Sequence, residues 1–370
     1  MANGPVIALD LGGSLAKMAL YVPGDMNTRP AAVLVKAFQD YFVASLSFYS
    51  HIIEGYIFLF TAPISETIDV VLSFISDHHL PRSRCIPVLC CTGGGAHKFS
   101  RRLATRTRYD NVVTPHEIDM VVQGLSFMAR HGFKQQLSTV SLTSDKEVIL
   151  SPFSGVLPDL ILAQIGTGIS FVHVSHGVGK RVDGLALGGG TFMGLARIIA
   201  GRKLGFHEAM ELAAVGVPAN ADILIGDICS FNSDYLGLNM TKLAAALGKC
   251  QGERDDAHIA DAIASLLQIL CFNIAHIAAL NARLAHCEHV LFAGSFIGGY
   301  QLTQRYLSEA LEWYFPSAIP MFVRHDGFLG VIGALSCDPN FADAFQSSMG
   351  DINFTDDKEM QEATEFVTWK

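Results

Sequence analysis

The stretch VIALDLGGSLAKMALYV, residues 6–22, decides the fold. A β-rich apolar run ends at Asp10, two glycines and a serine interrupt it, and the apolar pattern then resumes. This predicts a strand, a tight turn and a second strand. The pattern returns at residues 159–174, DLILAQIGTGISFVHV, where a Gly-Thr-Gly turn follows Gln164. Two halves that begin alike, about 150 residues apart, predict two similar α/β lobes that face each other across a cleft.

Further motifs extend both halves. PVLCCTGGGAHKF at residues 87–99 predicts a buried strand that ends in three glycines, and residues 114–130 predict a helix. In the second half, a glycine loop leads into a helix at residues 186–201, and HVLFAGSF at residues 289–296 predicts a strand. We therefore expect an N-terminal lobe at 1–135, a linker or peripheral hairpin at 136–158, a C-terminal lobe at 159–337 and an acidic tail at 338–370.

The composition narrows the function classes. Charged residues are 16% of the 370-residue chain, and 35 acidic residues outnumber 26 basic ones, so the chain lacks the basic field that holds nucleic acid. The eight cysteines include no CxxC pair, and the start of the chain has no basic region typical of a secretory signal, which favours a reduced cytoplasmic protein. The apolar stretch at 266–280 is shorter than the roughly 18 residues of a spanning helix. We expect no membrane span, and a core or subunit-interface helix there.

Glycine turns after strands let backbone N–H groups approach a phosphate chain without a Cβ in the way. A single such turn is most often an ordinary tight turn. Several turns of this kind in one chain favour a bound nucleotide, and neither a P-loop motif nor a GxGxxG fingerprint occurs in the sequence. The turns are Gly12-Gly13-Ser14, Gly166-Thr167-Gly168, Gly188-Gly189-Gly190-Thr191 and Gly294-Ser295.

Two charged residues flank the first turn. Asp10 lies at the expected strand end, where a carboxylate would hold Mg²⁺ beside the phosphates of ATP. Lys17 follows seven residues later and would neutralise the transferring phosphoryl group. An aspartate in such a place also serves as a simple turn former, and this alternative stays open.

Glu117 has two competing interpretations. The segment Thr114-Pro115-His116-Glu117 fits a capping box, in which Glu117 satisfies a backbone N–H at the helix start. Alternatively, a carboxylate at a helix start facing a cleft is placed to act as a general base for an attacking hydroxyl.

Arg181 precedes the triple glycine and would make paired hydrogen bonds to the carboxylate of an acidic substrate. The alternative is a solvated surface arginine beside Lys180.

Taken together, the motifs resemble the eukaryotic-type (type II) pantothenate kinase family over residues 6–335. DLGGS alone fits many actin-like kinases, whereas the combination of CTGGGAHKF, a helix start with Glu-x-Asp, and LGGGTFxGL is specific. The matching segments are DLGGSLAK, CTGGGAHKF, HEIDMVVQGL, QIGTGIS, KRVDGLALGGGTFMGL, FHEAMELAAVG, ADILIGDI, FAGSF and HDGFLGVIGAL.

The resemblance implies an actin-like, sugar-kinase-like fold made of two ribonuclease-H-like lobes, and a homodimer. It implies transfer of the γ-phosphate of ATP, with Mg²⁺, to the primary hydroxyl of pantothenate, the first step of coenzyme A synthesis. An acyl-coenzyme A such as acetyl-coenzyme A would act as a competitive feedback inhibitor.

The resemblance also implies roles for single residues. Glu117 matches the catalytic base, while Ser170 and Arg181 match residues that contact pantothenate and the inhibitor. Phe206 would lie near the nucleotide. The phosphate-binding and nucleotide-binding positions would be Asp10, Gly12, Gly13, Ser14, Lys17, Gly166, Thr167, Gly168, Gly188, Gly189, Gly190, Thr191, Phe192 and Ser295.

The sequence departs from the family at a few positions. Gln164 stands where asparagine is usual, and Asp183, Leu185 and Ala186 replace small hydroxyl residues. Ser14 replaces the common threonine and keeps the hydroxyl. Two alternatives remain: a sugar or N-acetyl sugar kinase of the same fold, and a catalytically silent relative that binds acyl-coenzyme A.

Overall fold

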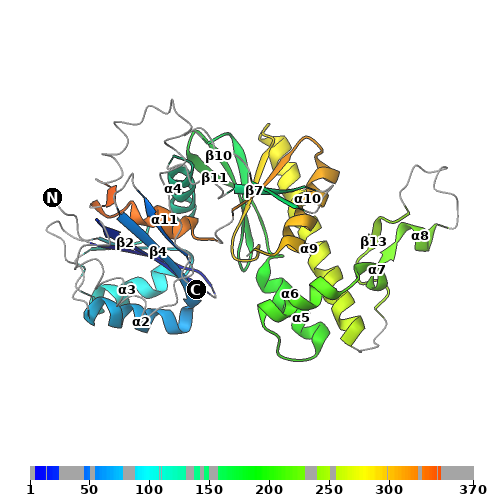
Figure 1. Cartoon of the computed structure of the whole chain (residues 1–370), viewed down its shortest axis with the longest axis horizontal. Helices are drawn as coiled ribbons and strands as arrows, with labels where there is room; N and C mark the ends of the chain where they lie inside the picture. Colours follow the sequence, from blue (N-terminus) through cyan, green and yellow to red (C-terminus); the bar gives the residue numbers. More distant parts are fainter. Residues whose placement is uncertain are drawn as a thin grey trace.

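The protein is represented by a computed structural model, drawn in Figure 1. It describes residues 5–13, 15–24, 46–50, 55–77, 88–107, 109, 111–130, 137–141, 146–149, 157–229, 240–250, 256–297, 299–323, 327–339 and 341–342.

The first sheet has six strands in the order β3-β4-β2-β1-β5-β6. The neighbours β1, β2, β4 and β3 pair antiparallel, while β5 and β6 run parallel to β1. Every residue of β1 is buried, because helices cover both faces of the sheet. The strands are β1 (Val6–Leu11), β2 (Leu15–Pro23), β3 (Leu46–Ser50), β4 (Gly55–Pro63), β5 (Val88–Thr92) and β6 (Asn111–Val113).

The second sheet has seven strands in the order β11-β10-β9-β14-β15-β7-β8. Again three neighbours pair antiparallel, and β14 and β15 run parallel to β9. The hairpin β7–β8, from the segment expected to be a linker or hairpin, extends this sheet beyond β15. The strands are β7 (Leu137–Ser141), β8 (Lys146–Ile149), β9 (Leu160–Ile165), β10 (Ile169–Ser175), β11 (Val178–Leu185), β14 (His289–Ala293) and β15 (Ile319–Val323).

The two sheets share one topology. The set β4-β2-β1-β5-β6 corresponds strand by strand to β11-β10-β9-β14-β15, with a three-strand antiparallel meander followed by two parallel strands in each. This duplication confirms the predicted actin-like, sugar-kinase-like fold with two α/β lobes.

Helices form layers outside and between the sheets (Figure 1). On the outer face of the first sheet lie α2 (Ile64–Asp77) and α3 (Ala96–Arg106), and between the sheets lie α4 (Glu117–Arg130) and α11 (Leu329–Leu335). The outer face of the second sheet packs against α5 (Gly189–Ala200), α6 (Phe206–Val215), α9 (Asp256–Leu284) and α10 (Gln301–Tyr314). A small projection carries α7 (Pro218–Ala221), β12 (Ile223–Leu224), α8 (Ile225–Ile228) and β13 (Leu243–Ala245).

Glycines allow α4 and α11 to approach each other closely. A Cβ at Gly124 would overlap the carbonyl oxygen of Leu329, and a Cβ at Gly333 would overlap that of Met120. Although α11 follows the second sheet in the sequence, it packs against α4 and β1 of the first lobe. The chain therefore crosses back, and the central hydrophobic core draws side chains from both sheets.

The long helix α9 has 29 residues, so the prediction of a short apolar stretch at 266–280 was wrong in length. Polar residues do not end the helix, because Asn273 donates a hydrogen bond to the carbonyl of Ile269 in its own helix (2.8 Å). Residues His258–Leu284 are long and apolar enough to cross a membrane by length and composition alone, and 61% of the most apolar window is buried inside the molecule. Most of α9 therefore serves as a core helix.

The segment predicted as an acidic tail begins inside the first lobe. Phe341 is fully buried, with its ring centroid 5.1 Å from Tyr21 and 5.8 Å from Phe127. Asp338 is also buried and accepts a hydrogen bond from the backbone N–H of Val88 (3.2 Å). Residues 338–342 were therefore wrongly assigned to a surface tail, and residues 343–370 lie outside the described part of the chain.

Candidate active site

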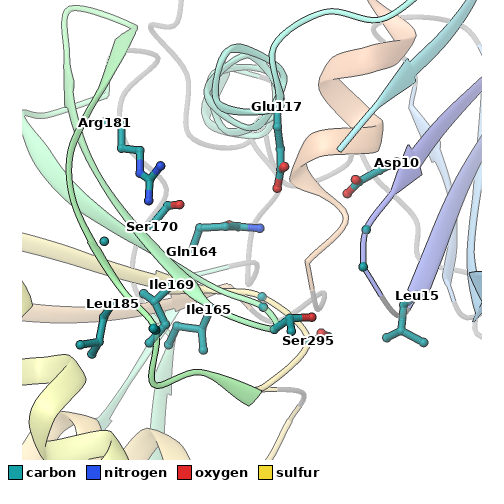
Figure 2. Close-up of a pocket in the computed structure, with 18 of the residues that line it drawn as sticks. Asp10, Leu15, Glu117, Gln164, Ile165, Ile169, Ser170, Arg181, Leu185 and Ser295 are labelled. Carbon is teal, nitrogen blue, oxygen red and sulfur yellow. The ribbon is translucent and has the colours of Figure 1, made fainter. Parts of the chain in front are cut away.

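A cleft of about 860 Å³ opens between the lobes, where the strand ends of the two sheets meet. Both glycine hairpins, the start of α4 and the wall formed by β10 and β11 contribute side chains to it (Figure 2). The lining residues are Asp10, Gly12, Gly13, Leu15, Lys17, Glu117, Gln164, Ile165, Gly166, Thr167, Gly168, Ile169, Ser170, Arg181, Val182, Asp183, Gly184, Leu185, Ala186, Gly294 and Ser295.

The first corner of the cleft carries an ion pair. Asp10 ends β1 and lies opposite Lys17 of β2 in the strand register. The Nζ of Lys17 is 3.6 Å from Oδ2 of Asp10 and donates a hydrogen bond to the carbonyl of Gly327 (2.6 Å). Gly93 has φ +89°, and a Cβ there would lie 2.5 Å from Oδ1 of Asp10. The CTGGG glycines thus make room for this carboxylate.

The second corner is built from backbone hydrogen bonds. The N–H of Gly166 donates to the carbonyl of Gly168 (2.9 Å) and closes the turn between β9 and β10. At the start of α5, the N–H groups of Gly189 and Gly190 donate to the carbonyls of Gly166 (2.9 Å) and Thr167 (3.0 Å). A Cβ at Gly188 would lie 2.7 Å from the carbonyl oxygen of Thr167, so the triple glycine packs directly on the turn.

The corners of the two lobes lie face to face. A Cβ at Gly13 would come within 3.5 Å of the Thr167 hydroxyl oxygen. Gly294, at φ +121°, packs so tightly on Ile165 that a Cβ would overlap its carbonyl oxygen, which places Ser295 on the cleft wall. A triphosphate in this cleft would therefore meet glycine backbone from both lobes.

Glu117 is the first residue of α4, and its carboxylate projects into the cleft near Asp10 (Figure 2). The capping box with Thr114 as N-cap is not formed, because the helix begins at Glu117 itself. Its carboxylate instead accepts a hydrogen bond from the backbone N–H of Gly94. The buried hydroxyl of Thr92 donates to the carbonyl of Pro115 (3.3 Å) and fixes the segment before the helix.

The carboxylates are held in an environment that favours protonation. Burial raises the pKa of Asp10, and Lys17 offsets part of this effect. Although Glu117 is open to the cleft, partial burial raises its pKa, the negative charge of Asp10 raises it further, and Lys17 opposes both. A carboxylate with a raised pKa is a stronger proton acceptor than an exposed glutamate.

Arg181, Ser170 and Gln164 form the wall opposite Asp10 (Figure 2). Together with Glu117 they also line a smaller adjoining cavity of about 160 Å³. Gln164 pairs with Ser170 in the strand register, and among the described residues its buried Oε1 has no hydrogen-bond partner. The sequence analysis noted Gln164 only as a departure from a pattern and gave it no role.

The remaining predicted site residues lie elsewhere. Thr191 donates to the carbonyl of Ala186 (2.8 Å) and stabilises the glycine loop. Phe192 does not line the cleft: its side chain is fully buried, because the first turn of α5 points it into the core. Phe206 packs on Phe192 and Phe296, with ring centroids 6.2 and 6.0 Å away, also behind the cleft. Ser14 lies outside the described residues.

The site suits a divalent cation that is shared with phosphates. Among the residues that the structure describes, no cluster of three His, Cys, Asp or Glu side chains forms a separate metal site. Mg²⁺ is commonly bound by one or two carboxylates together with substrate phosphates and water. Asp10, which is buried at the cleft edge with Glu117 nearby, fits this donor set.

Comparison with known proteins identifies the family. The model of the Fumble family matches residues 6–337. The chain belongs to the Fumble family. The Fumble match begins at the first residue of β1 and ends just after α11, so it includes both corners of the cleft.

Named relatives agree with this assignment and confirm the resemblance to type II pantothenate kinases. A pantothenate kinase from Schizosaccharomyces pombe is 31% identical over 89% of this chain and 80% of its own length. Pantothenate kinase 2 from Arabidopsis thaliana is 30% identical over 89% of this chain, which spans 38% of that protein. A 4'-phosphopantetheine phosphatase from Mus musculus is 28% identical over 90% of this chain, which spans 41% of that protein.

Solved structures with a related arrangement include a ROK-family glucokinase from Streptomyces griseus in complex with glucose and AMPPNP. Its sequence identity is 12%, and the TM-score is 0.46 over 90% of this Fumble-family chain and 99% of the glucokinase.

Proposed function

We propose that this chain is a pantothenate kinase, which transfers the γ-phosphate of ATP to the primary hydroxyl of pantothenate at the start of coenzyme A synthesis. Family membership supports the class of reaction. The observation that carries the proposal is the position of Glu117, which lies in one cleft with both glycine corners and Arg181. A base, a phosphate cradle and a receptor for an acid thus surround one space.

The phosphate chain of ATP would lie between the two corners. The glycine turns allow close approach of backbone N–H groups, and the Lys17 ammonium would offset the negative charge of the transferring group. Asp10 and the carbonyl of Gly327 hold Lys17 in place from two sides. Mg²⁺ held by Asp10 would neutralise further phosphate charge when bound.

Glu117 would accept the proton of the attacking hydroxyl. Its carboxylate points into the cleft from the first residue of α4, and its raised pKa makes it a stronger base. The hydrogen bond from Gly94 fixes the carboxylate, so little reorganisation is needed when the acceptor binds.

The opposite wall suits an acceptor that has an acid at one end and hydrogen-bonding groups in its middle. Arg181 would pair with the carboxylate of pantothenate, and Ser170 lies beside it. The amide of Gln164 lies between Ser170 and Glu117, where it would meet the secondary hydroxyl or amide of pantothenate. This arrangement favours pantothenate over glucose, which has no carboxylate.

The assembly and regulation that the resemblance implies are further parts of the proposal. We infer a homodimer through α9, where Leu280 and Leu284 are exposed, the latter at 81%. Competitive inhibition by acetyl-coenzyme A would follow from its pantothenate moiety entering the same wall. Sedimentation over a range of concentrations tests the dimer, and a monomer at every concentration would contradict it.

A coupled assay of ADP production tests the function. The protein is incubated with ATP, Mg²⁺ and pantothenate, glucose or N-acetylglucosamine, and mass spectrometry identifies the product. We expect ADP only with pantothenate, together with 4'-phosphopantothenate. ADP with a sugar alone would indicate a sugar kinase. Binding of acetyl-coenzyme A without ADP production would indicate a silent relative, and phosphate release from 4'-phosphopantetheine would indicate a phosphatase.

A further inference from the structure

A carboxylate on the cleft wall lies close to Arg181 but is held away from it. Asp183 is two residues after Arg181 on β11, and both line the cleft. Its Oδ1 accepts a hydrogen bond from the N–H of Gly184 (2.7 Å), and its Oδ2 accepts one from Nδ2 of Asn281 (3.1 Å). Both carboxylate oxygens of Asp183 therefore have partners other than the arginine.

The local backbone brings Asp183 within reach of the Arg181 guanidinium. The strand register shifts so that Val172 pairs with Arg181 and Phe171 with Asp183, which leaves Val182 as a bulge. Bulges redirect neighbouring side chains and are common beside active sites. Here Nε of Arg181 donates to the backbone carbonyl of Asp183 (3.3 Å), so the guanidinium already contacts that residue.

Gly184 completes this arrangement. A Cβ at this position would overlap Nη2 of Arg181, so only glycine leaves room for the guanidinium. A rotation of the Asp183 side chain would therefore bring its carboxylate to the arginine without moving the backbone far. Carboxylate and guanidinium form strong paired hydrogen bonds when both are free.

Asn281 supplies the restraint from a distant element. It lies on α9, 98 residues from Asp183 in the sequence, and its side chain is buried with 8% exposed. Its amide nitrogen has two hydrogens, and both are donated: one to Asp183 and one to the carbonyl of Ile277 (2.9 Å). The bond within α9 fixes the amide, and the amide fixes the carboxylate.

We propose that Asn281 is a positioning residue that holds the Asp183 carboxylate away from Arg181 and keeps the guanidinium free for the carboxylate of the acceptor. The inference rests on the proposed function, because it assigns Arg181 to an acidic acceptor. Without Asn281, Asp183 would compete with the acceptor at an effective concentration on the order of millimolar, as for any tethered ligand. Selectivity for an acidic acceptor thus depends on a contact between β11 and α9.

The experiment compares pantothenate with its alcohol analogue, in which a CH₂OH group replaces the carboxylate. In the N281A variant we expect the KM for pantothenate to rise about tenfold, since one charged hydrogen-bonded contact becomes contested. The KM for the alcohol analogue and both kcat values should change by less than about twofold, because neither depends on a free Arg181.

A second substitution tests the cause. In the N281A/D183N double variant the competing charge is gone, so the KM for pantothenate should return to near its wild-type value. The N273A variant is a matched control, because Asn273 also donates to a carbonyl of α9 but has no contact with the cleft in its hydrogen bonding (2.8 Å to Ile269). It should leave both KM values unchanged.

The D183E variant repeats the test at an exposed residue if N281A fails to fold. Its longer side chain no longer fits the Asn281 amide, so it should raise the KM for pantothenate alone. Equal changes with both acceptors, or no recovery in the double variant, would overturn the inference and leave Asn281 as a structural residue.

A crystal structure of N281A gives a readout that needs no acceptor. We expect the Asp183 carboxylate to be paired with the Arg181 guanidinium. A carboxylate that remains on the Gly184 N–H and directed to α9 would overturn the inference. If the wild-type protein phosphorylates neither acceptor, the proposed function fails, and this structure still decides the inference about Asn281.

Discussion

The two corners of the cleft have the same backbone but different chemistry. In the first lobe, the strand register sets Asp10 against Lys17 beside the glycine turn. In the second lobe, the corresponding hairpin sets Gln164 against Ser170. The first corner is therefore charged and the second is neutral, although both end a buried strand and both open on the same cleft.

This difference separates two tasks that the duplicated fold has to perform. A charged corner suits phosphoryl transfer, because it offsets charge that moves during the reaction. A neutral corner with an amide and a hydroxyl suits recognition of an uncharged part of the acceptor. Glu117 lies at the boundary, near Asp10 on one side and the Gln164 amide on the other (Figure 2).

Removal of the base between the corners should have the largest effect. In E117Q, we expect kcat to fall by about two orders of magnitude or more, because the amide cannot accept the hydroxyl proton. Pantothenate binding, measured by calorimetry, should change little, since glutamine keeps the shape of the side chain. Unchanged phosphorylation by E117Q would refute its role as the base.

Removal of charge from the first corner should come next. In K17M, kcat should fall about 100-fold, the usual loss for one electrostatic contact in a transition state. The KM for pantothenate should stay within about twofold, because Lys17 belongs to the charged corner and not to the acceptor wall. A large rise in this KM with kcat preserved would contradict the division of tasks.

A change in the neutral corner should act on binding instead. In Q164M, the KM for pantothenate should rise up to about tenfold, the value of one hydrogen bond, with little change in kcat. The thermal midpoint should not fall, because the substitution removes a buried Oε1 that has no partner among the described residues. A loss of kcat with KM unchanged would assign Gln164 to the chemical step.

The pH dependence gives the smallest and finest test. Glu117 must be ionised to accept a proton, and its pKa is raised above the ordinary value of 4.5. The wild-type kcat/KM should therefore fall as pH drops through this raised pKa, and its acid limb should lie above pH 4.5. Because Lys17 lowers the pKa of Glu117, the residual activity of K17M should show an acid limb at higher pH than wild type. An acid limb that shifts to lower pH would contradict the electrostatic account.

Local sequence patterns predict the corners well. Apolar runs interrupted by Gly12-Gly13 and Gly166-Thr167-Gly168 specify strand, turn and strand within a few residues, so the duplicated fold follows from them. Glycines also mark close approaches, as at Gly93 beside Asp10.

Long-range packing is what the patterns miss. The sequence LGVIGAL predicts a helix but not that α11 returns to the first lobe, because that depends on its fit against Gly124 of α4. Phe192 follows a glycine loop in the sequence, yet the helix turn places it in the core. The bond between Asp183 and Asn281 joins residues 98 positions apart, and no local periodicity reports it.

A structure of the protein with a non-hydrolysable ATP analogue and pantothenate tests the central claim most directly. We predict that the triphosphate contacts the backbone of Gly12-Gly13 and of Gly166-Thr167-Gly168 together, with the pantothenate hydroxyl between the terminal phosphorus and the Glu117 carboxylate. A nucleotide bound to one lobe alone, or one whose terminal phosphate lies far from Glu117, would contradict the account.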